Sequence, residues 1–150
     1  MRTQIDAIDR LKEFGIKPSM QRVAIMDYLL HNRTHPTADI VFSNLYPSMP
    51  TLSKTTVYNT LKLLVQQGAI LEITIDEKNV RYDAEISKHA HFKCINCGRI
   101  YDIPIKKSKA LSIKKLGDLL IVDAQIYYKG YCEKCNKKIN KLYNTLISNS

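Results

Sequence analysis

Two pairs of cysteines, each with two residues between its members, constrain the fold of this 150-residue chain more than any other feature. Cys94 and Cys97 form the first pair, and Cys132 and Cys135 form the second. A C-x-x-C turn directs two thiolates at one ion, so two such turns complete a tetrahedral four-sulfur shell. These are all the cysteines of the chain. The sequence therefore predicts a structural zinc site that ties the C-terminal helix to the sheet before it.

The alternative for either pair is a redox-active dithiol. Neither pair stands at a helix start after a strand in a βαβ context, which is the usual setting of a thioredoxin-like pair. The 34 residues between the pairs exceed the spacing of compact zinc modules, but they leave room for a helix and two strands. A closed four-sulfur site offers no open coordination position, so the predicted role is structural rather than catalytic.

The first half of the chain has the period of helices. Apolar stripes and capping residues predict four of them: one near the N-terminus, one after Pro18-Ser19, one from Thr37, and one from Ser53 or Thr51 that ends at Gly68. Residues 71–75 and 80–82 then alternate between apolar and polar, which predicts a two-stranded hairpin. This order is that of a winged-helix DNA-binding domain, although other small α+β domains share it.

The second half predicts a sheet of short strands. Strands are expected at 89–94, 99–103, 119–123 and 125–131, with a helix near 106–116 and a final helix over 133–147. So small a sheet has little core and needs a metal site or a partner chain for stability. The predicted fold class is α+β, with a winged-helix domain at 1–82 and a small α/β metal-binding dimerisation domain at 83–150.

The net charge of +9 favours a polyanionic partner. The excess lies in the second half, since residues 1–80 hold nine basic and eight acidic residues and residues 81–150 hold fourteen and six. A solvated lysine-rich face is the simpler explanation, so charge alone does not locate a nucleic-acid site. We find neither a run of about 20 apolar residues nor an export signal, which predicts a cytosolic protein without membrane contact.

His89 and His91 are the candidates for a second metal site. Side chains two apart on a strand point to the same face, so both imidazoles can reach one ion. His35, Asp83 and Asp102 are further candidates, and such a mixed nitrogen and oxygen set suits Fe(II) or Mn(II). Each residue taken singly could instead be an ordinary solvated or core polar group, and spacing does not show that they meet. His31 has no assigned role.

Five segments of the chain occur in an order that resembles the ferric uptake regulator family of bacterial metal-dependent repressors. They are GIKPSMQR, HPTADIVF, TTVYNTLKLLVQQG, RYD and HAHFKCINCG. The resemblance covers roughly residues 3–143 and is strongest to the family's peroxide-sensing branch. Aspartate stands at 83 and 102, where iron-sensing members typically carry glutamate. The stretch between Asp102 and Cys132 looks shorter than in the best-known peroxide sensors, which leaves the dimer contacts open.

This resemblance implies a bacterial, cytoplasmic homodimer that binds a palindromic DNA operator and no small-molecule substrate. His35, Asp83, His89, His91 and Asp102 would form the regulatory Fe(II) or Mn(II) site, beside the structural Zn(II). Residues expected at DNA are Lys17 in the minor groove, Tyr58 and Asn59 at the bases, and Ser53, Lys54 and Thr55 at phosphate.

The mechanism implied by the resemblance is that peroxide, acting at bound Fe(II), oxidises His35 or His89 and releases the repressor from DNA. The chain would consume its own side chain and would not be an enzyme. The near alternative is an iron-responsive repressor of the same family. More distant alternatives are a metal-dependent hydrolase that uses the histidine site, and a zinc-containing adaptor that binds other proteins.

Overall fold

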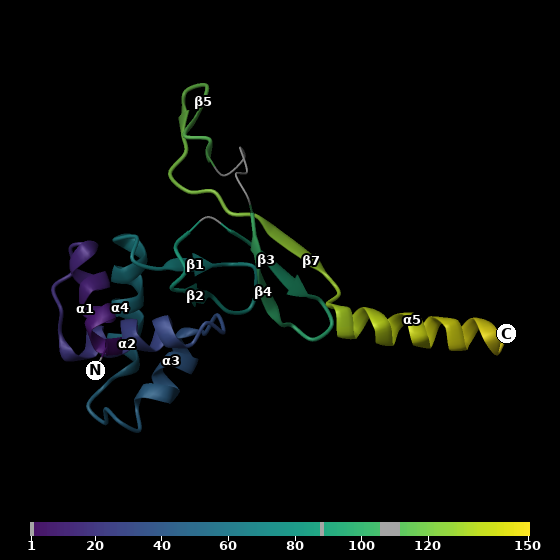
Figure 1. The fold of residues 1–150 in the computed structure, drawn as a ribbon, viewed down its shortest axis with the longest axis horizontal. Coiled ribbons are helices and arrows are strands. Elements are labelled where there is room, and N and C mark those ends of the chain that lie inside the picture. The colour runs from purple at the N-terminus through teal and green to yellow at the C-terminus, as the bar shows by residue number, and fades with distance from the viewer. Residues whose placement is uncertain (1, 88, 106–111) are drawn as a thin grey trace. The chain divides into compact units, whose positions relative to one another are not determined.

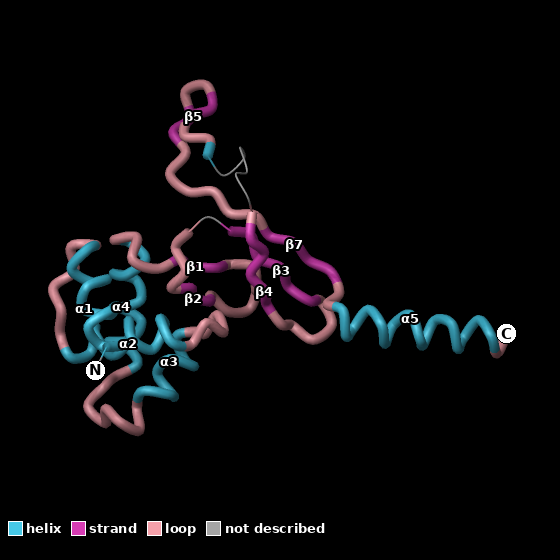
Figure 2. Tube along the Cα trace, viewed as in Figure 1, coloured by secondary structure: helices cyan, strands magenta, loops and turns pink. Residues whose placement is uncertain are grey.

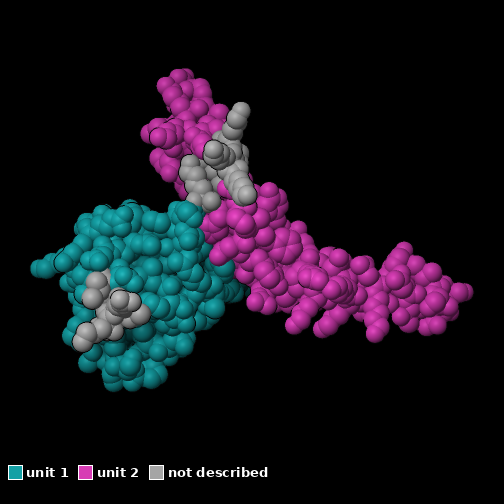
Figure 3. All heavy atoms as spheres, viewed as in Figure 1, with its two compact units in different colours: residues 1–87 teal, residues 88–150 magenta. Residues whose placement is uncertain are grey.

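The computed structural model describes residues 2–87, 89–105 and 112–150, and the chain divides into two compact units, 1–87 and 88–150 (Figure 3). The division falls five residues later than the domain boundary expected at 82 and 83. Asp83 and the segment after it therefore belong to the first unit. The side chains of residues 2–5 are outside the description.

The first unit begins with four helices, α1 (Arg2–Glu13), α2 (Met20–His31), α3 (Ala38–Leu45) and α4 (Lys54–Gln66) (Figure 1). The expected capping residues open three of them. The hydroxyl of Ser19 accepts from the Arg22 N–H at 3.3 Å, and Thr37 caps α3 in the same way. Ser53, and not Thr51, caps α4, with 3.0 Å from its hydroxyl to the Thr56 nitrogen. Each cap satisfies a backbone donor that a helix start leaves free.

The core of the first unit lies where the apolar faces of these helices meet. It includes Leu11 of α1, Ile25 and Leu29 of α2, and Leu61 and Leu64 of α4, each at most 1% exposed. α4 ends where Gly68 takes a positive φ of 81°, which glycine adopts without the penalty of a Cβ atom. Packing against this core thus holds one face of α4 in place, while the opposite face of the helix is exposed to solvent.

A short hairpin completes the first unit. β1 (Leu71–Ile73) pairs antiparallel with β2 (Arg81–Asp83), with Leu71 opposite Asp83. β1 is shorter than the predicted stretch 71–75, although Ile75 is still buried beyond its end, and β2 is shifted by one residue from the predicted stretch 80–82. Helices followed by this hairpin confirm the winged-helix prediction.

The second unit is built on a three-stranded sheet. β3 (His89–Cys94) lies in the middle, antiparallel to β4 (Ile100–Pro104) and parallel to β7 (Tyr127–Gly130) (Figure 2). His91 stands opposite Asp102 on β4, and Cys94 stands opposite Gly130 on β7. These two pairings position the chemically active residues of this unit.

The prediction of a helix near 106–116 is wrong for the last residues of that range. Residues 106–111 lie outside the description, but Lys115–Leu116 form strand β5, paired with β6 (Leu119–Leu120). Gly117 and Asp118 make the two-residue turn between them, and the φ of 56° at Gly117 suits such a hairpin turn. The strands expected at 119–123 and 125–131 are likewise shorter, as β6 and β7.

The last element is α5 (Glu133–Ser148), a helix of 16 residues with Cys132 at its N-cap position. Its extent agrees with the helix predicted at 133–147. Throughout the part of the chain that the structure describes, none of the helices has the length and apolar character that crossing a bilayer requires.

Candidate metal centres and nucleic-acid interface

All four cysteines meet in the second unit. Cys94 ends β3, Cys97 lies in the turn toward β4, Cys132 caps α5 and Cys135 lies in its first turn. Their sulfur atoms all lie within 4.8 Å of one another, and none of them forms a disulfide. The parallel pairing of Cys94 with Gly130 brings the end of β7, and with it the second cysteine pair, beside the first.

Hydrogen bonds to sulfur prepare this cluster for a cation. The backbone N–H groups of Cys132 and Cys97 donate to the Cys94 sulfur at 3.3 and 3.5 Å. These bonds stabilise the thiolate and lower the pKa of Cys94 to about 6. At Cys135, a hydrogen bond from the Asn96 amide lowers the pKa. The contact of Cys135 with the Cys132 sulfur, its burial and its contacts with the other two thiols act in the opposite direction. Their combined effect is larger and raises the pKa of Cys135 to about 11.

A thiolate at Cys135 is thus disfavoured in this cluster, because like charges at this spacing repel. A divalent cation removes that repulsion, and four sulfur donors with no oxygen or nitrogen suit Zn(II). The residues present therefore fit the structural zinc that the sequence predicts. Such an ion would join β3, the turn after it and the start of α5.

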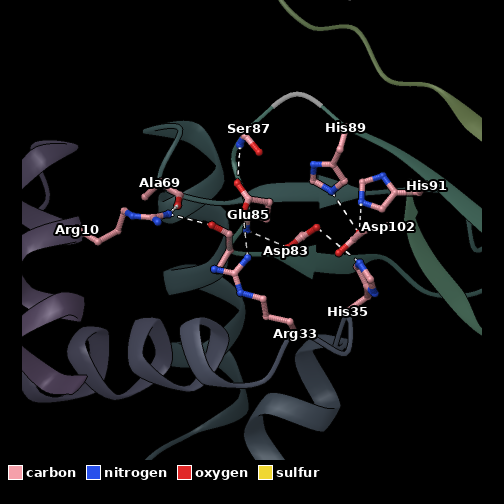
Figure 4. Close-up of polar contacts among 11 residues, drawn as sticks. Arg10, Arg33, His35, Ala69, Asp83, Glu85, Ser87, His89, His91 and Asp102 are labelled. Atoms are coloured by element: carbon pink, nitrogen blue, oxygen red, sulfur yellow. Dashed lines mark hydrogen bonds and ion pairs between the residues drawn. The ribbon is translucent and has the colours of Figure 1, made fainter. Parts of the chain in front are cut away.

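A second cluster in the same unit joins β3 to β4. His89 and His91 direct their Nε2 atoms to the same carboxylate oxygen, Oδ1 of Asp102, at 3.2 and 3.3 Å (Figure 4). The two imidazole centroids are 4.4 Å apart. The spacing in the sequence predicted that both histidines share a face of β3. The register, with His91 directly opposite Asp102, adds the carboxylate.

The two candidate metal ligands of the first unit, His35 and Asp83, contact each other. The Nε2 atom of His35 lies 3.5 Å from Oδ2 of Asp83, and both side chains are buried (Figure 4). His35 has a φ of 54°, which makes it the only non-glycine residue with positive φ among those described. The Arg81 guanidinium donates to the His35 carbonyl at 3.0 Å and helps to hold this conformation. Backbone strain of this kind clusters at functional sites.

Asp83 is itself held by residues that sequence reasoning missed. Its Oδ1 atom accepts from the Glu85 N–H at 2.9 Å, which leaves Oδ2 toward His35. Arg10 on α1 donates to the carbonyls of Ala84 and Ala69 at 2.9 and 3.0 Å. A single arginine in an amphipathic helix gives no sequence signal for a partner 74 residues away.

Glu85 forms a further anchor beside Asp83. Its carboxylate accepts from the Ser87 N–H at 3.0 Å and pairs with Arg33 at 3.1 Å. The bonds from Ser87, followed in size by those from Arg33, lower the pKa of Glu85 to about 2. The chain after β2 is therefore fixed to α1 and to the loop after α2.

His31 belongs to neither histidine cluster. Its Nδ1 atom lies 2.8 Å from the carbonyl of Asp27 and 3.3 Å from the Asp27 carboxylate, four residues earlier on α2. This local contact accounts for its position at the end of the helix.

All six residues predicted to contact DNA are exposed in the first unit. Lys17 precedes α2, and the others occupy the cap and first two turns of α4: Ser53, Lys54, Thr55, Tyr58 and Asn59. Lys17 and Asn59 line one groove of about 430 Å³ together with Arg22, whose guanidinium donates to the Lys17 carbonyl at 2.8 Å. The minor-groove and base-reading candidates therefore share one surface of this unit.

Asp39 is an acidic residue on that surface that the sequence did not single out. Its Oδ1 atom accepts from the Tyr58 hydroxyl at 3.4 Å and lies 3.9 Å from the Lys54 ammonium. Burial and then the Asp39 carboxylate raise the pKa of Tyr58, which keeps the phenol protonated as a donor. Asp39 thus orients two of the candidate DNA contacts.

Comparison with known proteins gives consistent matches over most of the chain. Residues 13–129 match the ferric uptake regulator family. The peroxide operon regulator of Bacillus subtilis strain 168 is 33% identical over 138 residues, which cover 90% of this chain and 94% of that protein. The peroxide-responsive repressor PerR of Staphylococcus aureus strain Mu50 is 30% identical over 135 residues, with 89% and 91% covered.

Solved structures show the same fold. The ferric uptake regulator of Francisella tularensis with iron superposes with a TM-score of 0.64 at 27% identity, over 84% of this chain and 98% of that one.

Proposed function

This chain belongs to the ferric uptake regulator family of metal-responsive transcriptional repressors, and on that premise we propose that it senses peroxide. The support for peroxide rather than iron is twofold. Its curated relatives at 30 and 33% identity are peroxide regulators. Both carboxylates of its histidine clusters are aspartates, Asp83 and Asp102, as in the branch that the sequence resembles.

The proposed regulatory site takes His35 and Asp83 from the first unit and His89, His91 and Asp102 from the second. Imidazole and carboxylate donors suit Fe(II) or Mn(II), and two aspartates neutralise one divalent charge. The His35–Asp83 pair alone offers two donor residues and the β3–β4 cluster alone offers three. One ion bound by both sets would have five ligands and would link the units.

Such a link explains how metal could control DNA binding. The first unit carries the candidate DNA contacts, and the second carries the zinc site and the expected dimer contacts. An ion that binds only one arrangement of the two units stabilises that arrangement by its differential affinity. Because linkage is reciprocal, operator DNA should also tighten metal binding. The operator expected for a symmetric dimer is palindromic.

Bound Fe(II) would supply the reducing power that activates peroxide next to the histidine ligands. In the net reaction His35 or His89 loses two electrons and gains one oxygen atom at a ring carbon, while the second peroxide oxygen leaves as water. The oxidised ring is a poorer ligand, so the link between the units weakens and repression ends. Mn(II) would hold the dimer on DNA without this oxidation.

An iron-responsive repressor is the second candidate, favoured by the fold shared with the iron-bound regulator of Francisella tularensis. Mass spectrometry of the Fe(II)-loaded chain after a low dose of peroxide separates the two. Peroxide sensing predicts one added oxygen on the peptide containing His35 or His89, together with loss of operator binding. Unmodified histidines and preserved DNA binding would leave the iron-responsive function. The Mn(II)-loaded chain is the matched control and should remain unmodified.

A further inference from the structure

The C-terminal helix α5 carries an apolar face that remains exposed. Its members are Ile139, Leu142, Tyr143, Leu146 and Ile147, which are 37, 65, 63, 71 and 55% exposed. They recur at intervals of three and four residues, the spacing of one helix face. Among the 16 residues of α5 only Cys135, at the zinc cluster, is buried. The family match ends at residue 129, so this face lies outside it.

The opposite face of α5 is polar. Lys137, Lys141, Asn144 and Ser148 recur at the same intervals and line a shallow groove along the helix. An amphipathic helix of this length is marginally stable in water by itself, because its stability comes mainly from packing of the apolar face. The exposed face therefore requires a partner with an apolar surface of similar length.

We propose that this partner is α5 of a second copy of the chain, packed antiparallel through the same five residues. The proposal rests on the proposed function only in that family members bind DNA as dimers, which supplies the second copy. An interface with twofold symmetry uses the same patch on both subunits and must be self-complementary. A twofold axis between Leu142 and Tyr143 meets this condition, since it sets Ile139 of each copy beside Leu146 of the other.

The distribution of charge favours the antiparallel direction. All four lysines of α5, Lys134, Lys137, Lys138 and Lys141, precede Leu142, and residues 142–150 contain no charged side chain. Antiparallel packing sets the basic half of each helix beside the uncharged half of the other and opposes the two helix dipoles. Parallel packing would bring the eight lysines of the pair to one end.

Charge exchange at Leu142 tests the pairing in the full-length, zinc-loaded chain without regulatory metal or DNA. Leu142→Glu and Leu142→Lys are the test variants, and Asn144→Glu and Asn144→Lys on the polar face are matched controls. Sedimentation velocity gives the dimer dissociation constant of each variant. A size-tagged version of one partner identifies heterodimers in a mixture of L142E and L142K. Leu142 is largely exposed in the single chain, so its substitution leaves the fold of the protomer intact.

We expect L142E and L142K each to raise the dissociation constant by at least about tenfold, as removal of a central interface residue does. Their equimolar mixture should form heterodimers near the wild-type affinity, and the Asn144 variants should match the wild type. A monomeric wild type, an unchanged L142E, or a mixture without rescue would overturn the proposal. Because this assay needs neither Fe(II) nor peroxide, its outcome is independent of the sensing function.

Discussion

His91 stands directly opposite Asp102 across the β3–β4 pair, with 3.3 Å between Nε2 and Oδ1. The same oxygen lies 3.2 Å from His89, two residues earlier on β3. Three side chains from two adjacent strands thus meet at one carboxylate oxygen. Because adjacent strands hold this geometry, we regard the β3–β4 cluster as the rigid part of the proposed regulatory site.

Asp102→Asn should separate metal binding from folding. The amide keeps the size of the side chain but removes the charge that favours a divalent cation. We expect Mn(II) affinity to fall by about tenfold or more, on the scale of a lost charge-assisted contact. Thermal stability of the metal-free chain should change little, since Asp102 is partly exposed. Isothermal titration calorimetry measures the affinity, and an undiminished affinity would remove Asp102 from the site.

Arg10→Ala should weaken the metal site from a distance. The substitution removes two hydrogen bonds from a charged donor to the carbonyls of Ala69 and Ala84. We expect a loss of about 1.5–3 kcal/mol in the free energy of unfolding of the first unit. Mn(II) affinity should fall as well, because Ala84 adjoins Asp83. Urea unfolding and Mn(II) titration measure the two effects.

Asp9→Ala, on the same helix, is the control for Arg10. A lower stability with wild-type Mn(II) affinity in the Arg10 variant would show that Arg10 does not position Asp83.

Protonation of Glu85 should lower the free energy of unfolding in acid. Its pKa falls from an ordinary 4.5 to about 2 on folding. The carboxylate therefore stabilises the folded state fully above pH 4.5, and this contribution disappears as the pH falls to about 2. The side chain is 38% exposed, so solvent screening limits the effect to at most about 1 kcal/mol.

The measurement is the difference in unfolding free energy between the wild type and Glu85→Gln across this pH range. The difference should shrink with acid as Glu85 becomes protonated. A difference that stays constant from pH 5 to pH 2 would contradict the assigned pKa.

Two substitutions on α4 should affect DNA binding in different ways. Asn59→Ala should cost about 1–3 kcal/mol on the operator and relax the preference at one base position of each half-site. Lys54→Ala should weaken operator and random DNA alike and reduce the salt dependence by about one ion per copy. Binding at several salt concentrations distinguishes the two. Equal losses on both DNA sequences for the Asn59 variant would exclude base reading.

Local signals in the sequence predicted the local structure well. Ser19, Thr37 and Ser53 cap the helices they were expected to open, because an N-cap depends on its own side chain and the next few residues. The four cysteines and the shared face of His89 and His91 follow from spacing alone in the same way. The prediction of a helix over 106–116 misses the hairpin turn at Gly117, although Gly-Asp between two short strands is itself a local two-residue turn signal.

Long-range relationships were outside the reach of the sequence. The contact between Asp102 and the two histidines depends on the β3–β4 register, which is set by the turn at 95–99, where the Cys94 N–H donates to the Arg99 carbonyl. The bonds of Arg10 to residues 69 and 84, and of Asp39 to Tyr58, depend on how the helices pack. A periodic pattern shows which face of an element is buried, but not which polar group meets it.

The most direct test of the account is a double-mutant cycle on Mn(II) affinity, with His35→Ala in the first unit and His91→Ala in the second. If one ion binds both residues, each variant should lose at least about tenfold in affinity, and the double variant should lose clearly less than the product of the two effects. Electron paramagnetic resonance of free Mn(II) measures each affinity on the zinc-loaded chain. Wild-type affinity in the His35 variant, or full additivity of the two losses, would contradict a shared ion and the sensing mechanism built on it.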